Sequence, residues 1–118
     1  MLLAVGEHKL GRLEPQARRM ATPLAGGLGC TYLEICGALV GGTMVIGGLL
    51  GRTEASQDDE RAQALAARYR ARFLAEQGHT QCQAIRDRIH APGGPGTCTA
   101  VVELAAELLL ALLDEEGL

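Results

Sequence analysis

Residues 36–51 read Cys-Gly-Ala-Leu-Val-Gly-Gly-Thr-Met-Val-Ile-Gly-Gly-Leu-Leu-Gly, and no charged side chain interrupts them. Four of the glycines recur at the spacing of one helix face, namely Gly37, Gly41, Gly48 and Gly51. Glycine costs about 1 kcal/mol relative to alanine in a helix interior, so a helix this rich in glycine needs a compensating contact. We therefore expect a central helix over residues 36–51 whose glycine face packs closely against another backbone. Its remaining sides are expected to be buried through Leu39, Met44, Val45, Ile46 and Leu50.

The composition of the chain predicts a helical protein. Of its 118 residues 47% are hydrophobic, but only 3% are aromatic and there is no Trp. Alanine, leucine and glycine must therefore fill the core, which favours closely packed helices and disfavours a large sheet. We predict an all-α single domain over residues 1–118, a compact bundle of about five to six helices around the central one. The net charge of −3, with acidic and basic residues mixed, argues against a nucleic-acid-binding protein.

Start and stop signals predict further helices on both sides of the central one. The expected ranges are 2–9, 15–21, a helix capped by Ser56 that ends at Gln77, a helix from 81 to about 89 capped by Thr80, and 98–116 capped by Thr97. A glycine-rich loop over residues 25–31 leads into the central helix, and the Pro/Gly-rich run 91–96 separates the last two helices. The long helix that ends at Gln77 carries an apolar stripe, with arginines on its outer face.

The uncharged run from residue 35 to residue 51 is 17 residues long, at the lower limit of about 17–25 residues for a membrane-spanning helix. Its ends lack an aromatic belt and a basic cluster, so we interpret it as a buried core helix. No secretory signal is visible, because Glu7 and His8 interrupt the first apolar residues. We expect a cytoplasmic protein. The first residues read like the second half of a helix without an N-cap, which indicates a true start further upstream.

The chain has four cysteines, at positions 30, 36, 82 and 98. Three of them, Cys36, Cys82 and Cys98, fall in the first turn of a predicted helix, where free amides and the helix dipole lower the pKa of a thiol. Inert core thiols are the alternative, because cysteine is among the most buried residue types. Neither a C-x-x-C pair nor a zinc-finger spacing is present. A reversible disulfide needs only two of these thiols, whereas a metal centre needs three or four to converge.

The run Cys36-Gly37-Ala38-Leu39-Val40-Gly41, with its apolar continuation, resembles a protein family named for its C-GCAxxG-C-C cysteine pattern. The two later cysteines of that family match Cys82 and Cys98, and the resemblance covers nearly the whole chain. The resemblance implies a redox-active protein without specifying its reaction. The first cysteine of the family normally precedes the stretch that matches residues 2–10, and here only Met1 precedes that stretch. The chain is therefore expected to lack the extreme N-terminus of the family, and Cys30 is an additional cysteine.

The leading hypothesis is thiol-based redox chemistry, with Cys36 as the reactive thiolate and Cys82 or Cys98 as its partner. Such a protein would be a thiol–disulfide oxidoreductase or would transfer electrons. The expected partner is a redox protein or a small thiol, and neither nucleic acid nor a membrane is expected to bind. A homodimer is also consistent with the exposed apolar residues of the first helix.

Two rival hypotheses stay open. In the first, a metal ion or an iron–sulfur cluster is held by the same three cysteines, and the residues beside the bound group are Cys30, Gly37 and Gly41. In the second, the chain is a helical interaction protein whose cysteines are structural.

Overall fold

The computed structural model describes all residues from 1 to 118. It contains six α-helices, one π-helical turn and one 3-10 turn, so the prediction of an all-α fold with five to six helices is confirmed. In chain order the elements are η1 (Leu2–Gly6), α1 (Glu7–Leu10), α2 (Pro15–Ala21), η2 (Thr22–Leu24), α3 (Gly37–Leu50), α4 (Glu60–Gln77), α5 (Cys82–His90) and α6 (Thr99–Glu115). The only paired extended backbone is an isolated antiparallel bridge between Ile35 and Gln81.

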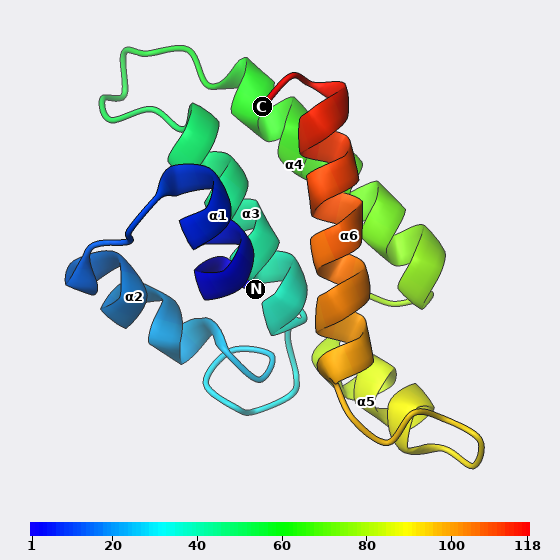
Figure 1. Ribbon diagram of the computed structural model, residues 1–118. Helices are drawn as coiled ribbons and strands as arrows, with labels where there is room; N and C mark the ends of the chain where they lie inside the picture. The colour runs from blue at the N-terminus through cyan, green and yellow to red at the C-terminus, as the bar shows by residue number, and fades with distance from the viewer.

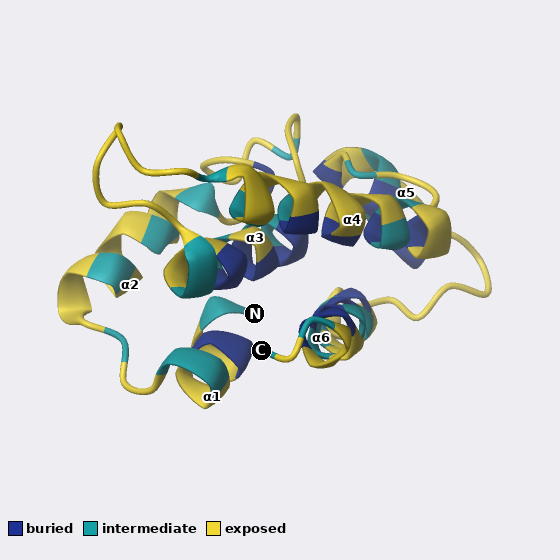
Figure 2. Ribbon diagram, turned by 90° about the horizontal axis from the view of Figure 1, so that it is seen from above, coloured by how far each residue is buried: buried dark blue, intermediate teal, exposed yellow.

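The predicted central helix is α3, which lies between the N-terminal helices on one side and α4 and α6 on the other (Figure 1). None of the helices is both long enough and apolar enough to cross a lipid bilayer. Buried residues occupy the sides of α3, α4 and α6 that face one another (Figure 2). On α3, Leu39, Val45 and Ile46 are each at most 1% exposed. Met44 and Leu50, which were also expected in the core, are only half-buried: Met44 lines an open groove beside η1 and α2, and Leu50 is the last residue of the helix.

The glycines of α3 allow the close contacts that their spacing predicts. A Cβ added at Gly41 would lie 3.0 Å from the Met1 Cβ and 3.2 Å from the Leu2 backbone nitrogen, so the N-terminal segment rests directly on this face. On another face of α3, a Cβ at Gly42 would lie 2.5 Å from the Tyr69 hydroxyl oxygen. These contacts bury backbone and ring surface where any larger residue would hold the elements apart.

Several predicted helix starts are wrong by one to three residues. Ser56 does not cap α4, because residues 52–57 form a turn in which the Gln57 side chain accepts the Thr53 amide hydrogen at 2.8 Å. The helix starts at Glu60 instead, whose amide donates to the Asp58 carboxylate at 2.9 Å.

The last two helices also begin later than expected. Thr80 does not cap α5, because Gln81 is the N-cap residue. The Thr80 carbonyl instead accepts a hydrogen bond from the backbone of another segment. At α6 the Thr97 hydroxyl accepts the Thr99 amide hydrogen at 3.3 Å, the contact expected of the predicted cap. The helix nevertheless begins at Thr99, so Cys98 is the N-cap residue and not the first helical residue. The predicted first helix is interrupted, since it consists of the π turn η1 followed by one turn of α-helix, α1.

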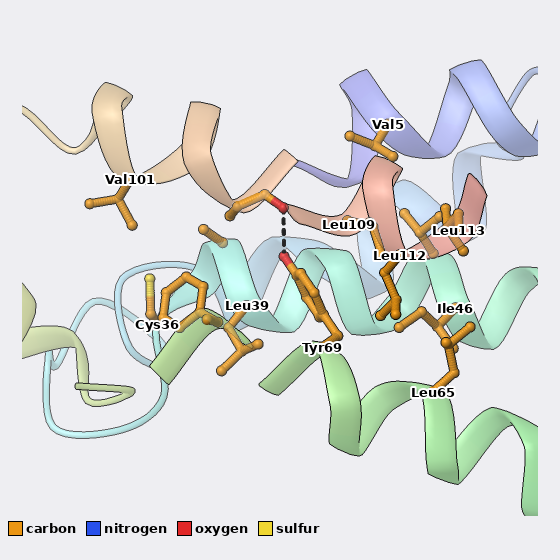
Figure 3. Close-up of a cluster of buried hydrophobic side chains, with 14 of the residues drawn as sticks. Val5, Cys36, Leu39, Ile46, Leu65, Tyr69, Val101, Leu109, Leu112 and Leu113 are labelled. Atoms are coloured by element: carbon orange, nitrogen blue, oxygen red, sulfur yellow. Dashed lines mark hydrogen bonds between the residues drawn. The ribbon is translucent and has the colours of Figure 1, made fainter. Parts of the chain in front are cut away.

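Polar contacts join α4 to α6 along their length. The Tyr69 hydroxyl donates a hydrogen bond to the Ala105 carbonyl at 3.1 Å inside the core (Figure 3). Nearer the C-terminus, the Arg72 Nη2 lies 2.6 Å from the Glu115 Oε2, and Arg68 pairs with both Glu115 and Glu116. The arginines predicted on the outer face of this helix thus hold the end of α6 as well as facing solvent.

Candidate functional site

Residues 26–30 form a left-handed turn, in which five successive residues have φ between 57° and 66°. Glycines occupy three of these positions without steric cost, but Leu28 and Cys30 each adopt a conformation that costs about 1–2 kcal/mol for an L-residue. Backbone hydrogen bonds offset this cost, including one of 2.7 Å from the Gly29 amide to the Pro23 carbonyl. The turn folds the chain back so that its first two glycines lie beside the starts of α3 and α5.

Two backbone hydrogen bonds hold the start of α3 beside the start of α5. The Cys36 amide donates to the Thr80 carbonyl at 2.8 Å, and the Cys82 amide donates to the Glu34 carbonyl at 2.8 Å. These bonds flank the isolated antiparallel bridge. Successive residues of extended chain point to opposite faces, so Cys36 and Cys82 lie on the same face as diagonal neighbours. Two cysteines that are far apart in the sequence are thus placed together by main-chain pairing.

The left-handed turn lies directly against Cys82, which the backbone pairing holds beside Cys36. Both thiols are free. Gly27 packs directly against Cys82, since a Cβ added at Gly27 would overlap the Cys82 Cβ. The φ of Gly27, 60°, also disfavours any other residue. Only glycine fits there without moving the cysteine.

Cys36, Cys82 and Cys98 line one cavity of about 260 Å³ at this end of the molecule. The rest of the lining comes from the left-handed turn and from apolar residues of α3, α5 and α6, with Tyr32 and Arg86 as the larger polar side chains. Cys36 and Cys82 are buried, whereas Cys98 is exposed at the start of α6. The cavity therefore combines two enclosed thiols with one that solvent reaches.

The enclosed thiols are less acidic than their place at helix starts suggests. Burial raises the pKa of the Cys36 thiol, although the amides of Ala38 and Leu39 act in the opposite direction. Burial also raises the pKa of Cys82, as does a charge on Cys36, while the nearby Arg86 lowers it. The expected lowering of the thiol pKa is therefore wrong for both residues, because the loss of hydration outweighs the helix amides. Both are held as neutral thiols near neutral pH.

Arg86 is the only charged residue that lines the cavity. Its guanidinium carbon lies 4.2 Å from the centre of the Tyr32 ring, a cation–π contact. It forms no ion pair with a carboxylate. Neither residue was predicted from the sequence to belong to the site. Arg86 could have been predicted, because it lies four residues after Cys82, one turn along the same helix face. Tyr32 could not, because no sequence feature near it predicts the left-handed φ of 65° that orients it.

The other residues assigned from the sequence are divided between the cavity and its surroundings. Gly37 lines the cavity. Cys30 is exposed and lies outside the lining, although its sulfur lies against Gly26, which does belong to it. Gly41 contacts Met1 and does not line the cavity.

The residues present do not fit a metal centre in their observed arrangement. No group of three or more His, Cys, Asp or Glu side chains is placed so that it could hold a metal ion. The three thiols share a cavity, yet they do not converge on one point as the ligands of zinc or of an iron–sulfur cluster do.

The fold and the cavity define a class of small all-α proteins that present several free cysteines at the starts of packed helices. Residues 1–112 match the model of a family described as "Putative redox-active protein (C_GCAxxG_C_C)", and the chain belongs to this family. A search of curated proteins and a search of solved structures each found no match.

Proposed function

We propose that the protein carries out reversible thiol–disulfide exchange in the cavity lined by Cys36, Cys82 and Cys98. The observation that carries the proposal is the shared lining itself: thiols from three separate segments open onto one space, and one of them is exposed. Membership of a family described as redox-active supports this reading. The proposal places the protein in a reducing compartment such as the cytoplasm, where thiols of this kind stay reduced between turnovers.

Exposure assigns the first step to Cys98. Its thiolate attacks one sulfur of a substrate disulfide, the substrate S–S bond breaks, and the departing sulfur leaves with the electron pair and takes a proton from water. A second protein thiolate then attacks the Cys98 sulfur and releases the other half of the substrate. The protein loses two electrons and two protons and gains one disulfide, and the substrate becomes two thiols.

Cys82 is the better second thiol of the two that are buried. Arg86 favours its thiolate, whereas no positive side chain offsets the burial of Cys36. The role of reactive thiolate that the sequence suggested for Cys36 therefore passes to Cys98 in this proposal. Cys36 remains the third thiol of the cavity, next to Cys82.

A thiol count against a redox buffer tests the proposal. The Cys30→Ser variant, which lacks the thiol outside the lining, is equilibrated anaerobically with mixtures of reduced and oxidised dithiothreitol, alkylated and weighed by mass spectrometry. We expect two thiols per chain to disappear together and to return on reduction. Adding Cys82→Ser or Cys98→Ser should abolish the paired loss, whereas thiols that react only after unfolding would contradict the proposal.

Metal analysis separates this function from a metal centre. Because the thiols do not converge on a point, anaerobically purified protein should carry metal far below one equivalent and show no visible absorption band. A stoichiometric metal ion together with a sulfur-to-metal band would overturn the exchange mechanism.

A further inference from the structure

Arg86 gives the thiol cavity a positive charge that the protein itself leaves unpaired. Its guanidinium is stacked on Tyr32 at 4.2 Å and makes no ion pair. The neighbouring acid on the same helix, Asp87, accepts a hydrogen bond from Gln83 at 2.8 Å. No acidic residue lines the cavity. A partly desolvated cation without a counter-charge is suited to bind an anion from outside.

The position of this cation is fixed by the same backbone pairing that places the cysteines. The Tyr32 carbonyl accepts the Gln83 amide hydrogen at 2.9 Å, which ties the ring to the first turn of α5. Cys82 and Arg86 are one turn apart on that helix and therefore share a face. The charge and the thiol thus face the same space, in which Cys98 also opens.

The size of the cavity limits what it can accept. Its volume of about 260 Å³ lies just below the range of about 300–1,000 Å³ for pockets that enclose drug-sized ligands. One arm of a small disulfide fits such a space, whereas a folded protein segment does not. The apolar residues Ile85, Val101 and Val102 suit a short hydrocarbon arm between the sulfur and its charged end.

We propose that the cavity selects small disulfides whose arms end in a carboxylate, with Arg86 binding the carboxylate while Cys98 attacks the sulfur. The inference rests on the proposed function and adds its substrate class. After the attack, the arm that stays on Cys98 keeps its carboxylate at Arg86, and the other arm leaves as a thiolate and is protonated by water. Attack of Cys82 on the Cys98 sulfur then releases the bound arm as a second thiol, so that the substrate gains the two electrons that the protein loses.

Three disulfides with short arms and different charges test the proposal. The probes are 3,3′-dithiodipropionate with carboxylate ends, 2-hydroxyethyl disulfide with neutral ends, and cystamine with ammonium ends. Each rate of thiol loss in the reduced Cys30→Ser protein is divided by the rate of the same probe with dithiothreitol, an uncharged thiol that differs from the arms of all three probes. We expect the order carboxylate, hydroxyl, ammonium, with about five- to tenfold between the first two, as expected for one partly buried charge pair.

Matched variants show whether Arg86 sets this order. Arg86→Gln should bring the three normalised rates together, and Arg86→Lys should restore part of the order because it keeps the charge without the planar fork. Arg70→Gln, which removes an exposed arginine of α4 that does not line the cavity, should leave the order unchanged. High salt should also reduce the differences among the three normalised rates of the wild-type protein. This measurement does not depend on the folding of any variant.

The outcomes distinguish the inference from the function on which it rests. If no probe oxidises the folded protein, the proposed exchange chemistry itself fails. If all three probes react at equal normalised rates, or if the order persists in Arg86→Gln, the substrate class is wrong while the exchange chemistry stands.

Discussion

At the scale of single residues, burial decides which thiol is reactive. Cys98 is exposed, whereas Cys36 is buried and its pKa is raised because the thiolate would lose hydration. Position at a helix start, the feature visible in the sequence, is the same for both. Solvent access therefore separates residues that the sequence pattern groups together.

Alkylation of the folded, reduced protein at neutral pH should follow this difference. We expect iodoacetamide to modify Cys98 and the exposed Cys30 first, Cys82 more slowly and Cys36 last, because the reagent needs both access and a thiolate. Because its pKa is raised, the rate at Cys36 should still be rising with pH where the rate of an ordinary thiol has levelled off. Peptide mapping over time measures all four rates, and rapid neutral-pH modification of Cys36 would contradict the assignment.

A second residue-scale prediction concerns the glycines of the left-handed turn. Gly27→Ala forces a side chain into both a positive φ and the Cys82 Cβ, so we expect a loss of about 2–4 kcal/mol in the free energy of unfolding. Gly29→Ala is the matched control, since its φ is 61° but nothing lies within 4 Å of an added Cβ. It should lose only about 1 kcal/mol, the conformational cost. Equal losses in urea unfolding would show that Gly27 does not pack against Cys82 as described.

At the scale of elements, α4 and α6 are held together by ion pairs as well as by apolar contacts in the core. A hydrogen bond from Arg72, together with the charges of Arg72 and Arg68, lowers the pKa of Glu115. A carboxyl group whose pKa is lower in the folded state stabilises the fold above its unfolded pKa, about 4.3 for Glu. That contribution disappears as the pH falls through the folded-state value.

Glu115→Gln should therefore lower the free energy of unfolding at neutral pH, and its difference from the wild type should vanish in acid. Glu103→Gln is a suitable control, because Glu103 is an exposed residue of α6 without an ion pair. High salt should shrink the effect of Glu115→Gln at neutral pH, since both partners are at the surface. A difference from the wild type that is the same at neutral and acid pH would rule out the ion pair as its cause.

The sequence predicted whole helices better than it predicted their starts. Glycine spacing in an uncharged run locates α3, and apolar periodicity locates α4 and α6, because each helix buries a face that repeats over several turns. The predicted start of α4 is wrong, since the side chain of Gln57 organises a turn that resembles no standard cap. The left-handed turn was not predicted, because Leu28 and Cys30 adopt a positive φ that their own residue types disfavour.

At the scale of the whole molecule, the fold collects thiols that lie far apart in the chain. The starts of α3 and α6 and the helix α5 lie at the same end of the molecule (Figure 1), and the backbone bridge fixes two of them relative to each other. The sequence could suggest Cys36, Cys82 and Cys98 because of their similar places before or within helices. It could not show that they share a cavity, nor that Arg86 and Tyr32 belong to it, because both facts depend on long-range pairing.

Mapping the disulfide of the oxidised monomer tests the shared cavity most directly. Reduced Cys30→Ser protein is oxidised with 3,3′-dithiodipropionate, the monomer is isolated, free thiols are blocked, and trypsin then places Cys36, Cys82 and Cys98 on separate peptides, residues 20–52, 73–86 and 89–118. We predict a linked pair of peptides 73–86 and 89–118, joined through Cys82 and Cys98, that dithiothreitol separates. A monomer with all three thiols unmodified, or linkage found only between chains, would contradict it.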